Sequence, residues 1–219
     1  MSRGGRQIVP RPSVWSHVDA APWGTTVDTV SGLDPLMRVI PTQERPAQPA
    51  FVGARSAAVL VTLAEGEHGP EVLLTRRSWT LRHHRGEISF PGGRMDPGES
   101  AVDTALREAH EEVGLDPARV EVIGELEHLN TVVSRSYIIP KVAVLTGERP
   151  ELRPSAAEVE RIMWVPLAER GAPGTYHGER WGTPPTDRLL HFFELSDETV
   201  WGATAHMLVD LLTRGSRPG

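Results

Sequence analysis

Residues 100–113 (SAVDTALREAHEEV) constrain the fold most, because their apolar side chains recur at the spacing of one helix face. Ser100 is a typical N-cap, with Asp103 in a capping-box-like position three residues later. Gly114 suits the left-handed position that ends a helix. The pattern predicts an amphipathic helix whose apolar face, turned toward a core, consists of Val102, Ala105, Leu106, Ala109 and Val113.

Apolar runs of strand length surround this helix. The turn-rich sequence GEHGP separates the first two runs and predicts a hairpin. We also expect a short helix near 33–40, a helical turn at 167–170, a loop over 171–185 and a closing amphipathic helix over 198–213. Mixed strands with two main helices indicate an α/β domain. The predicted strands are 57–63, 71–75, 88–90, 120–127, 137–145, 161–165 and 189–195.

The first 50 residues differ from the rest of the chain. They contain seven prolines, which interrupt long elements. They also contain Trp15 and Trp23, which are unusual in a polar disordered tail. We therefore predict a Pro-rich N-terminal extension over 1–50, packed on the domain or on a partner subunit, and one domain over 51–215. Since residues 1–48 precede every motif, we expect no catalytic group in them.

Composition excludes several classes of function. The chain has no cysteine, which excludes disulfides and thiolate-bound zinc. A net charge of -6 disfavours nonspecific binding to nucleic acid. No apolar run is long enough to span a bilayer, and the first residues lack the apolar stretch of a secretory signal. We expect a cytoplasmic protein without nucleic-acid or membrane partners.

Three carboxylates share one surface of the predicted helix. Glu108, Glu111 and Glu112 are three and four residues apart, so they repel one another in an isolated helix. A divalent cation such as Mg²⁺ removes this conflict, because it binds carboxylate oxygens together with water and substrate phosphates. Arg107, four residues before Glu111, can pair with it. The alternative for this short pattern is an ordinary solvated, charged helix face.

The wider spacing favours the metal site. The segment 92–115 fits G-x5-E-x7-R-E-U-x-E-E-x-G-U, where U is aliphatic, and resembles the Nudix box. With each fixed residue at roughly 7% background use, this match arises by chance at ~10⁻⁸ per register. The resemblance implies an α/β Nudix fold, with a mixed β-sheet sandwiched between α-helices, over the predicted domain 51–215. The matching residues are Gly93, Glu99, Arg107, Glu108, Ala109, Glu111, Glu112, Gly114 and Leu115.

The resemblance also implies the chemistry. Mg²⁺ or Mn²⁺ would be bound by Glu108, Glu111 and Glu112, with Glu99 in support and a backbone carbonyl near Gly92. A metal ion lowers the pKa of bound water and neutralises a diphosphate, and a carboxylate takes the proton from the water. The expected catalytic set is Glu108, Glu111, Glu112 and Arg107, and the general base is either Glu108 or one of two glutamates in a later loop, Glu158 and Glu160.

The segment before the box is cationic. Residues 76–85 contain four arginines and two histidines without an acidic residue. Residues 73–93 (LLTRRSWTLRHHRGEISFPGG) resemble the motif LLTxRSxxxRxxxGxxxFPGG of coenzyme A pyrophosphatases. This similarity implies that Arg77, Arg82 and Phe90 bind substrate, and the cationic segment adds Arg85 as a further candidate. One departure is the segment Asn130–Tyr137, which lacks the glycine expected near residue 136.

Three functions compete at this point. The first is hydrolysis of coenzyme A or a derivative to 3′,5′-ADP and (acyl-)4′-phosphopantetheine. The second is a Nudix pyrophosphatase for another nucleoside diphosphate derivative, such as a sugar nucleotide or a dinucleotide. The third is a non-catalytic nucleotide-binding regulator, which the complete set of box glutamates disfavours. The expected partner is a small nucleotide substrate, and a homodimer is expected by analogy alone.

Overall fold

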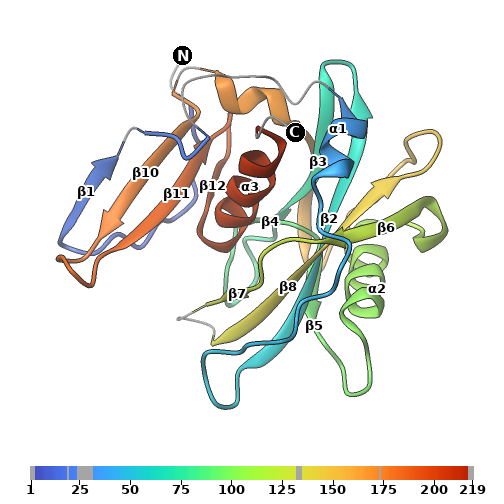
Figure 1. Cartoon of the computed structure of the whole chain (residues 1–219), viewed down its shortest axis with the longest axis horizontal. Helices are drawn as coiled ribbons and strands as arrows, with labels where there is room; N and C mark the ends of the chain where they lie inside the picture. The colour runs from blue at the N-terminus through green and yellow to red at the C-terminus, as the bar shows by residue number, and fades with distance from the viewer. Residues whose placement is uncertain (1–2, 19, 24–31, 132–134, 173, 217–219) are drawn as a thin grey trace.

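The computed structural model describes residues 3–18, 20–23, 32–131, 135–172 and 174–216 (Figure 1). Its centre is a mixed sheet. The strands are β2 (Arg55–Gly66), β3 (Gly69–Arg77), β4 (Ile88–Ser89), β5 (Gly92–Arg94), β6 (Val120–Glu125), β7 (Leu129–Asn130), β8 (Ser136–Leu145) and β9 (Val159–Pro166). Within the described residues, the path β4-β3-β2-β8-β6 is joined by β5 on β2, β7 on β8 and β9 on β3.

The chain builds this sheet from a hairpin and a crossover. β2 and β3 form the predicted antiparallel hairpin, whereas β2 and β8 are parallel. Parallel strands need a long connection. Here the connection contains α2 (Ala101–Val113) and the 3₁₀ helix η1 (Pro117–Arg119). The predicted mixed sheet is therefore confirmed.

Both faces of the sheet are buried. Side chains of a strand alternate between faces, and β2 accordingly sends Val61 and Leu63 into one core cluster but Ala58 and Leu60 into another. The second cluster packs against α2. The first packs against α3 (Gly202–Gly215), which lies on the opposite face (Figure 1).

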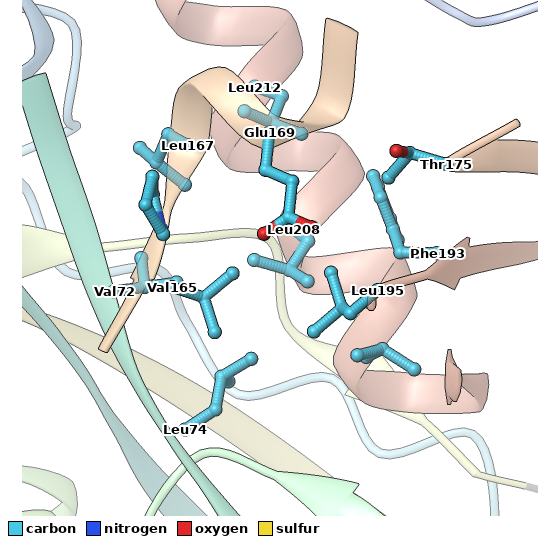
Figure 2. A pocket seen from close by; sticks show the side chains of 12 residues that line it. Val72, Leu74, Val165, Leu167, Glu169, Thr175, Phe193, Leu195, Leu208 and Leu212 are labelled. Atoms are coloured by element: carbon cyan, nitrogen blue, oxygen red, sulfur yellow. The ribbon is translucent and has the colours of Figure 1, made fainter. Parts of the chain in front are cut away.

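The core under α3 is closely filled. Figure 2 shows Leu208 and Leu212 of α3 facing Val72, Leu74 and Val165 of the sheet. The cavity between them measures about 20 Å³, which is room for little more than one water molecule. This region therefore serves packing and does not bind a nucleotide. No helix of the described residues is both long and apolar enough to cross a bilayer.

A second, smaller sheet flanks α3. It has the order β1-β10-β11-β12 and consists of β1 (Trp15–Val18), β10 (Tyr176–Trp181), β11 (Arg188–Glu194) and β12 (Thr199–Trp201). The prediction of a loop over 171–185 is thus wrong, because β10 lies inside it and pairs with both β1 and β11. The predicted helix start at 198 is wrong too: Thr199–Trp201 pair with β11, and the helix begins at Gly202, whose φ is 64°. The helical turn predicted at 167–170 is the 3₁₀ helix η2 (Leu167–Gly171).

The N-terminal segment packs on the rest of the chain. Besides β1, it forms α1 (Leu33–Arg38), and Leu36 is fully buried in the core under α3. The chain then crosses the edge of β6, where the carbonyl of Pro41 accepts a hydrogen bond from the amide of Glu125. Farther on, Glu44 forms an ion pair with Lys141, which is 3% exposed and also pairs with Glu125, each at 2.8 Å. The expectation that this segment packs on the domain is confirmed.

Candidate active site

Helix α2 is fixed in place at both ends and along one face. The Ser100 side chain accepts a hydrogen bond from the Asp103 amide, and the Asp103 carboxylate accepts one from the Ser100 amide, which is the predicted capping box. Gly114 ends the helix with φ 70°. Ala105 and Ala109 are buried against the sheet, so the rotation of the helix is set and its carboxylates meet β5.

Glu112 is buried, which an ordinary charged helix face would not require. Its side chain is 4% exposed, and its Oε2 accepts a hydrogen bond of 3.2 Å from the Gly92 amide. Burial, together with the charges of Glu108 and Glu158, raises the pKa of the Glu112 carboxyl to about 7, against the lowering by Arg77 and by the Gly92 hydrogen bond. Removing a carboxylate from water is costly unless a cation compensates it. The alternative of a solvated helix face is therefore excluded for Glu112.

Glu108 occupies a space that exists because residue 93 is a glycine. A Cβ at Gly93 would lie 2.3 Å from Oε1 of Glu108, closer than any van der Waals contact. A Cβ at Gly92 would instead meet the carbonyl oxygen of Ala58 at 2.5 Å. The two glycines thus have different tasks: Gly92 lets β5 approach β2, and Gly93 makes room for a carboxylate. Burial raises the pKa of Glu108 as well, opposed by its contact with Arg107.

Arg107 organises the outer carboxylates. Its Nε donates to Glu99 at 2.7 Å, and its Nη1 donates to Glu108 at 3.0 Å and to Glu111 at 3.1 Å. The predicted pairing of Arg107 with Glu111 is confirmed. The Arg107 hydrogen bond is also the largest cause that lowers the pKa of Glu99 to about 2. Arg107 therefore joins the predicted supporting residue Glu99 to the carboxylate surface of α2.

Glu158 lies close to this surface, and Glu160 does not. The carbonyl of Glu112 accepts a hydrogen bond from the Ser155 amide, which docks the segment before β9 on the end of α2. The carbonyl of Glu158 accepts another from Ser78, just after β3. Consequently the Glu158 charge acts on both Glu108 and Glu112, whereas the Glu160 carboxylate pairs with Arg76 at 3.3 Å.

The predicted substrate residues divide into three kinds. Arg77 reaches the carboxylates, with Nη1 3.4 Å from Glu112 Oε1 and Nη2 4.0 Å from Glu158 Oε2. Arg82 and Arg85 are exposed, and neither has an ion-pair partner among the residues that the structure describes. Phe90 is 1% exposed and belongs to the core under α3. The prediction that Phe90 binds substrate is not supported, because its ring has no free surface; it is a packing residue within the motif.

The carboxylates fit a divalent cation. Within the described part of the chain, no three acidic or histidine side chains already stand grouped as a metal requires. Glu108 and Glu112 nevertheless bring negative charge together: burial and neighbouring carboxylates raise the pKa of both, against the lowering by Arg107 at Glu108 and by Arg77 at Glu112. Mg²⁺ commonly uses one or two protein carboxylates and completes its shell with water and phosphate oxygens. The donor set present, the buried Glu112 and the partly buried Glu108 with Glu111 nearby, suits such a site.

Two residues that support the loop after β3, Trp79 and Gln7, match no fixed position of a motif. Gly86 in the loop after β3 has φ 70°, and a Cβ there would lie 2.3 Å from the Trp79 ring. Gln7, far away in the sequence, donates to the carbonyl of this glycine at 3.1 Å. The resemblance includes Gly86 but gives neither Trp79 nor Gln7 a role. Residues 132–134 of the segment that departs from the motif lie outside the described residues.

Comparisons with known proteins agree with this geometry. The family model for the NUDIX domain matches residues 54–198. Nudix hydrolase NudL of Photorhabdus laumondii is 37% identical over 72% of this chain and 83% of its own length. Nudix hydrolase 3 of Caenorhabditis elegans is 40% identical over 59% of this chain, which spans 55% of the worm protein. The crystal structure of a MutT/nudix family protein from Enterococcus faecalis has a similar fold, with a TM-score of 0.51 at 16% identity, covering 78% of this chain and 64% of the other.

Proposed function

Because this chain belongs to the Nudix hydrolase family, we propose that it hydrolyses a diphosphate linkage in a nucleoside diphosphate derivative, with Mg²⁺ or Mn²⁺ as cofactor. The observation that carries this proposal is the pair of α2 carboxylates at β5: Glu112, which is buried on the Gly92 amide, and Glu108, which is partly buried in the space that Gly93 leaves. Two like charges that have lost part of their water favour a cation and a polyanionic substrate. The catalytic domain spans 51–215, and 1–50 form an extension.

Each residue of the site has a proposed task. Glu108, Glu111 and Glu112 hold the metal, with the Gly92 backbone and Glu99 in support. Arg107 holds Glu99, Glu108 and Glu111 together and orients them through its hydrogen bonds. When bound, the metal neutralises the diphosphate and lowers the pKa of a water molecule. Water adds to one phosphorus, the bridging P–O bond breaks, and the leaving phosphate carries the electron pair.

We propose Glu158 as the general base. Its side chain is 52% exposed, so it can exchange a proton with solvent, and it lies near Glu112 without a strong ion pair. Glu160 is drawn to Arg76 instead. Glu108 stays an alternative base, since it too faces the site.

The proposed substrate is coenzyme A or an acyl derivative. The support is the motif of residues 73–93 and the exposed cations Arg82 and Arg85 at its centre. Arginine suits a bidentate contact with phosphate, and coenzyme A carries a 3′-phosphate in addition to its diphosphate. The main alternative is another nucleoside diphosphate derivative, for which the loop cations would contact the diphosphate itself.

A panel of diphosphates tests the proposal. Purified protein is incubated with coenzyme A, dephospho-coenzyme A, ADP-ribose and a sugar nucleotide, with Mg²⁺, Mn²⁺ or a chelator, and the products are resolved by chromatography. We expect metal-dependent cleavage, with coenzyme A giving the highest kcat/KM. Glu112→Gln should abolish it, whereas Glu121→Gln, an exposed glutamate of β6, should not. If the protein cleaves no diphosphate, the proposed hydrolase activity is overturned. If another compound is cleaved with a kcat/KM equal to or higher than that of coenzyme A, the proposed substrate is overturned.

A further inference from the structure

The N-terminal segment touches the loop between β3 and β4 through Gln7. The Gln7 side chain is buried, with 9% exposed. Its Nε2 donates to the carbonyl of Gly86 at 3.1 Å and to Glu198 at 2.5 Å, while its Oε1 accepts from the Thr199 amide at 2.8 Å. All three contacts bridge long distances in sequence. A side-chain amide, which both donates and accepts, is what this position requires.

Glu198, the carboxylate that Gln7 contacts, is itself held by the main sheet. Glu198 is 1% exposed and accepts hydrogen bonds from Arg76 at 2.5 Å and from Arg161 at 2.9 Å. These arginines belong to neighbouring strands, β3 and β9. Two guanidinium groups thus compensate the buried carboxylate and hold it in one place. Gln7 is therefore anchored to the main sheet, independently of the loop that it also contacts.

The near side of the contact leads to the candidate active site. Gly86 donates its amide hydrogen to the carbonyl of Arg77 at 3.1 Å, and Arg77 donates to the carbonyl of Glu87 at 2.9 Å. The Arg77 side chain in turn contacts Glu112. Gly86 thus lies opposite Arg77, whose side chain reaches the carboxylates. Holding the Gly86 carbonyl fixes the base of the loop at Arg77.

The tip of the loop has few anchors of its own. Residues 78–87 form what we call the cationic loop, and Arg82, His83, His84 and Arg85 at its tip are all exposed. His84 pairs with Glu87 within the loop. Beneath the tip, the Trp79 ring packs under Gly86, and the Arg6 guanidinium lies 4.7 Å from the centre of that ring. Both neighbours in the N-terminal segment, Arg6 and Gln7, therefore contact the cationic loop.

From these contacts we propose that Gln7 is a positioning residue: it clamps the cationic loop beside Arg77 before substrate binds. The proposal rests on the proposed function, in which this loop meets a phosphate of the substrate. A loop that is ordered in advance binds its ligand without first losing conformational entropy. Release of the clamp should therefore weaken substrate binding and leave the metal-binding carboxylates in place. It also assigns a task in the reaction to a segment without any motif.

The test compares Gln7→Ala with Gln43→Ala, a matched control in the same segment whose side chain is exposed. Hydrogen–deuterium exchange of the metal-free proteins, without substrate, reports the loop directly. We expect exchange in residues 78–87 to accelerate about five- to tenfold in Gln7→Ala, as the loss of one buried hydrogen bond implies, with peptides of α2 unchanged. The KM for the best diphosphate should rise by a similar factor while kcat is retained. Gln43→Ala should change neither.

Each outcome of these measurements supports or overturns the proposed role of Gln7. If hydrogen–deuterium exchange of residues 78–87 is the same in Gln7→Ala as in the wild type, the proposed clamp is overturned, regardless of KM and kcat. Faster exchange with an unchanged KM overturns its task in substrate binding, as does an equal loss of kcat. If wild-type protein cleaves no diphosphate, the proposed function fails, and the exchange result still judges the clamp. If Gln7→Ala lowers the Tm of the protein, the comparison is repeated with Gln7→Asn, whose amide is one methylene closer to the backbone: faster exchange confined to residues 78–87 supports the clamp, and unchanged exchange there overturns it.

Discussion

The Arg77 guanidinium lies 3.4 Å from the Glu112 carboxylate, which joins the last residue of β3 to the buried carboxylate of α2. The sequence groups Arg77 with Arg82 and Arg85 as substrate residues, because all three belong to the cationic segment 76–85. In the structure Arg77 faces the carboxylates, whereas Arg82 and Arg85 face solvent at the tip of the cationic loop. The three arginines should therefore affect catalysis differently.

Substitution of these arginines should separate two phosphate contacts. Arg77→Ala is expected to reduce kcat/KM for coenzyme A and dephospho-coenzyme A by similar factors, since it acts near the diphosphate. Arg82→Ala should reduce only the reaction of coenzyme A, by about 10- to 150-fold, the effect of one charge-assisted contact. Steady-state kinetics of both variants on both substrates decide this. Equal losses on the two substrates in Arg82→Ala would contradict a contact with the 3′-phosphate.

The buried charge of Glu112 should cost stability in the absence of metal. The folded-state pKa of about 7 exceeds the ordinary value of 4.5, so the contribution of Glu112 to stability is most favourable below pH 4.5 and is lost as the pH rises through 7. Glu112→Gln removes this decrease and should raise the free energy of unfolding at pH 8 by up to about 3 kcal/mol. At pH 4 the two proteins should differ little.

Urea unfolding in the presence of a chelator, at pH 4 and at pH 8, measures this difference. Saturating Mg²⁺ should reverse its sign by stabilising the wild type alone. A Glu112→Gln variant that is equally or less stable than the wild type at pH 8 without metal would show that the protein itself already compensates the carboxylate.

Gly93→Ala should impair activity with little loss of fold. The added methyl group meets the flexible end of Glu108, which can move away. Gly92→Ala meets the backbone of Ala58 instead and should destabilise the strand pairing of β5 with β2. Thermal unfolding together with kcat distinguishes the two variants. Normal turnover in a folded Gly93→Ala protein would contradict the proposed position of Glu108 at the metal.

Glu158→Gln and Glu160→Gln form a matched pair for the general base. Removal of a base commonly lowers kcat by about 10²- to 10⁴-fold, and we expect this loss in Glu158→Gln at saturating metal. Glu160→Gln should lose only its ion pair with Arg76 and keep most of its turnover. If Glu158→Gln turns over normally, the base is Glu108 or a water-mediated path.

The sequence predicts well those features of the fold that depend on residues close together in the chain. The helix α2, its capping box and its terminal glycine were all predicted, because each depends on residues at most four positions apart. The sequence could not separate Glu158 from Glu160. A register shift between Arg76 and Arg77, where β9 pairs with β3, belongs to the irregularities that re-aim strand side chains, and nothing in the local sequence marks it.

Long-range contacts explain the remaining differences. The sequence predicts a loop at β10 because the local preference for strand is weak there, and the pairing with β1 and β11 forms the strand nonetheless. Phe90 was assigned to substrate because it belongs to the motif, although burial shows that it packs in the core. Gln7 had no signal at all, since its partner Thr199 is 192 positions away in the sequence.

Lys141 is the only lysine of the chain, and it is 3% exposed between Glu44 and Glu125. Reagents that acylate lysine therefore meet no accessible side chain in the folded protein. Acylation at position 141 marks a molecule in which the part of the N-terminal segment that contains Glu44 has separated from β6 and β8. The mass increment on the peptide that contains residue 141 would thus count the opening of the N-terminal segment, without any engineered label.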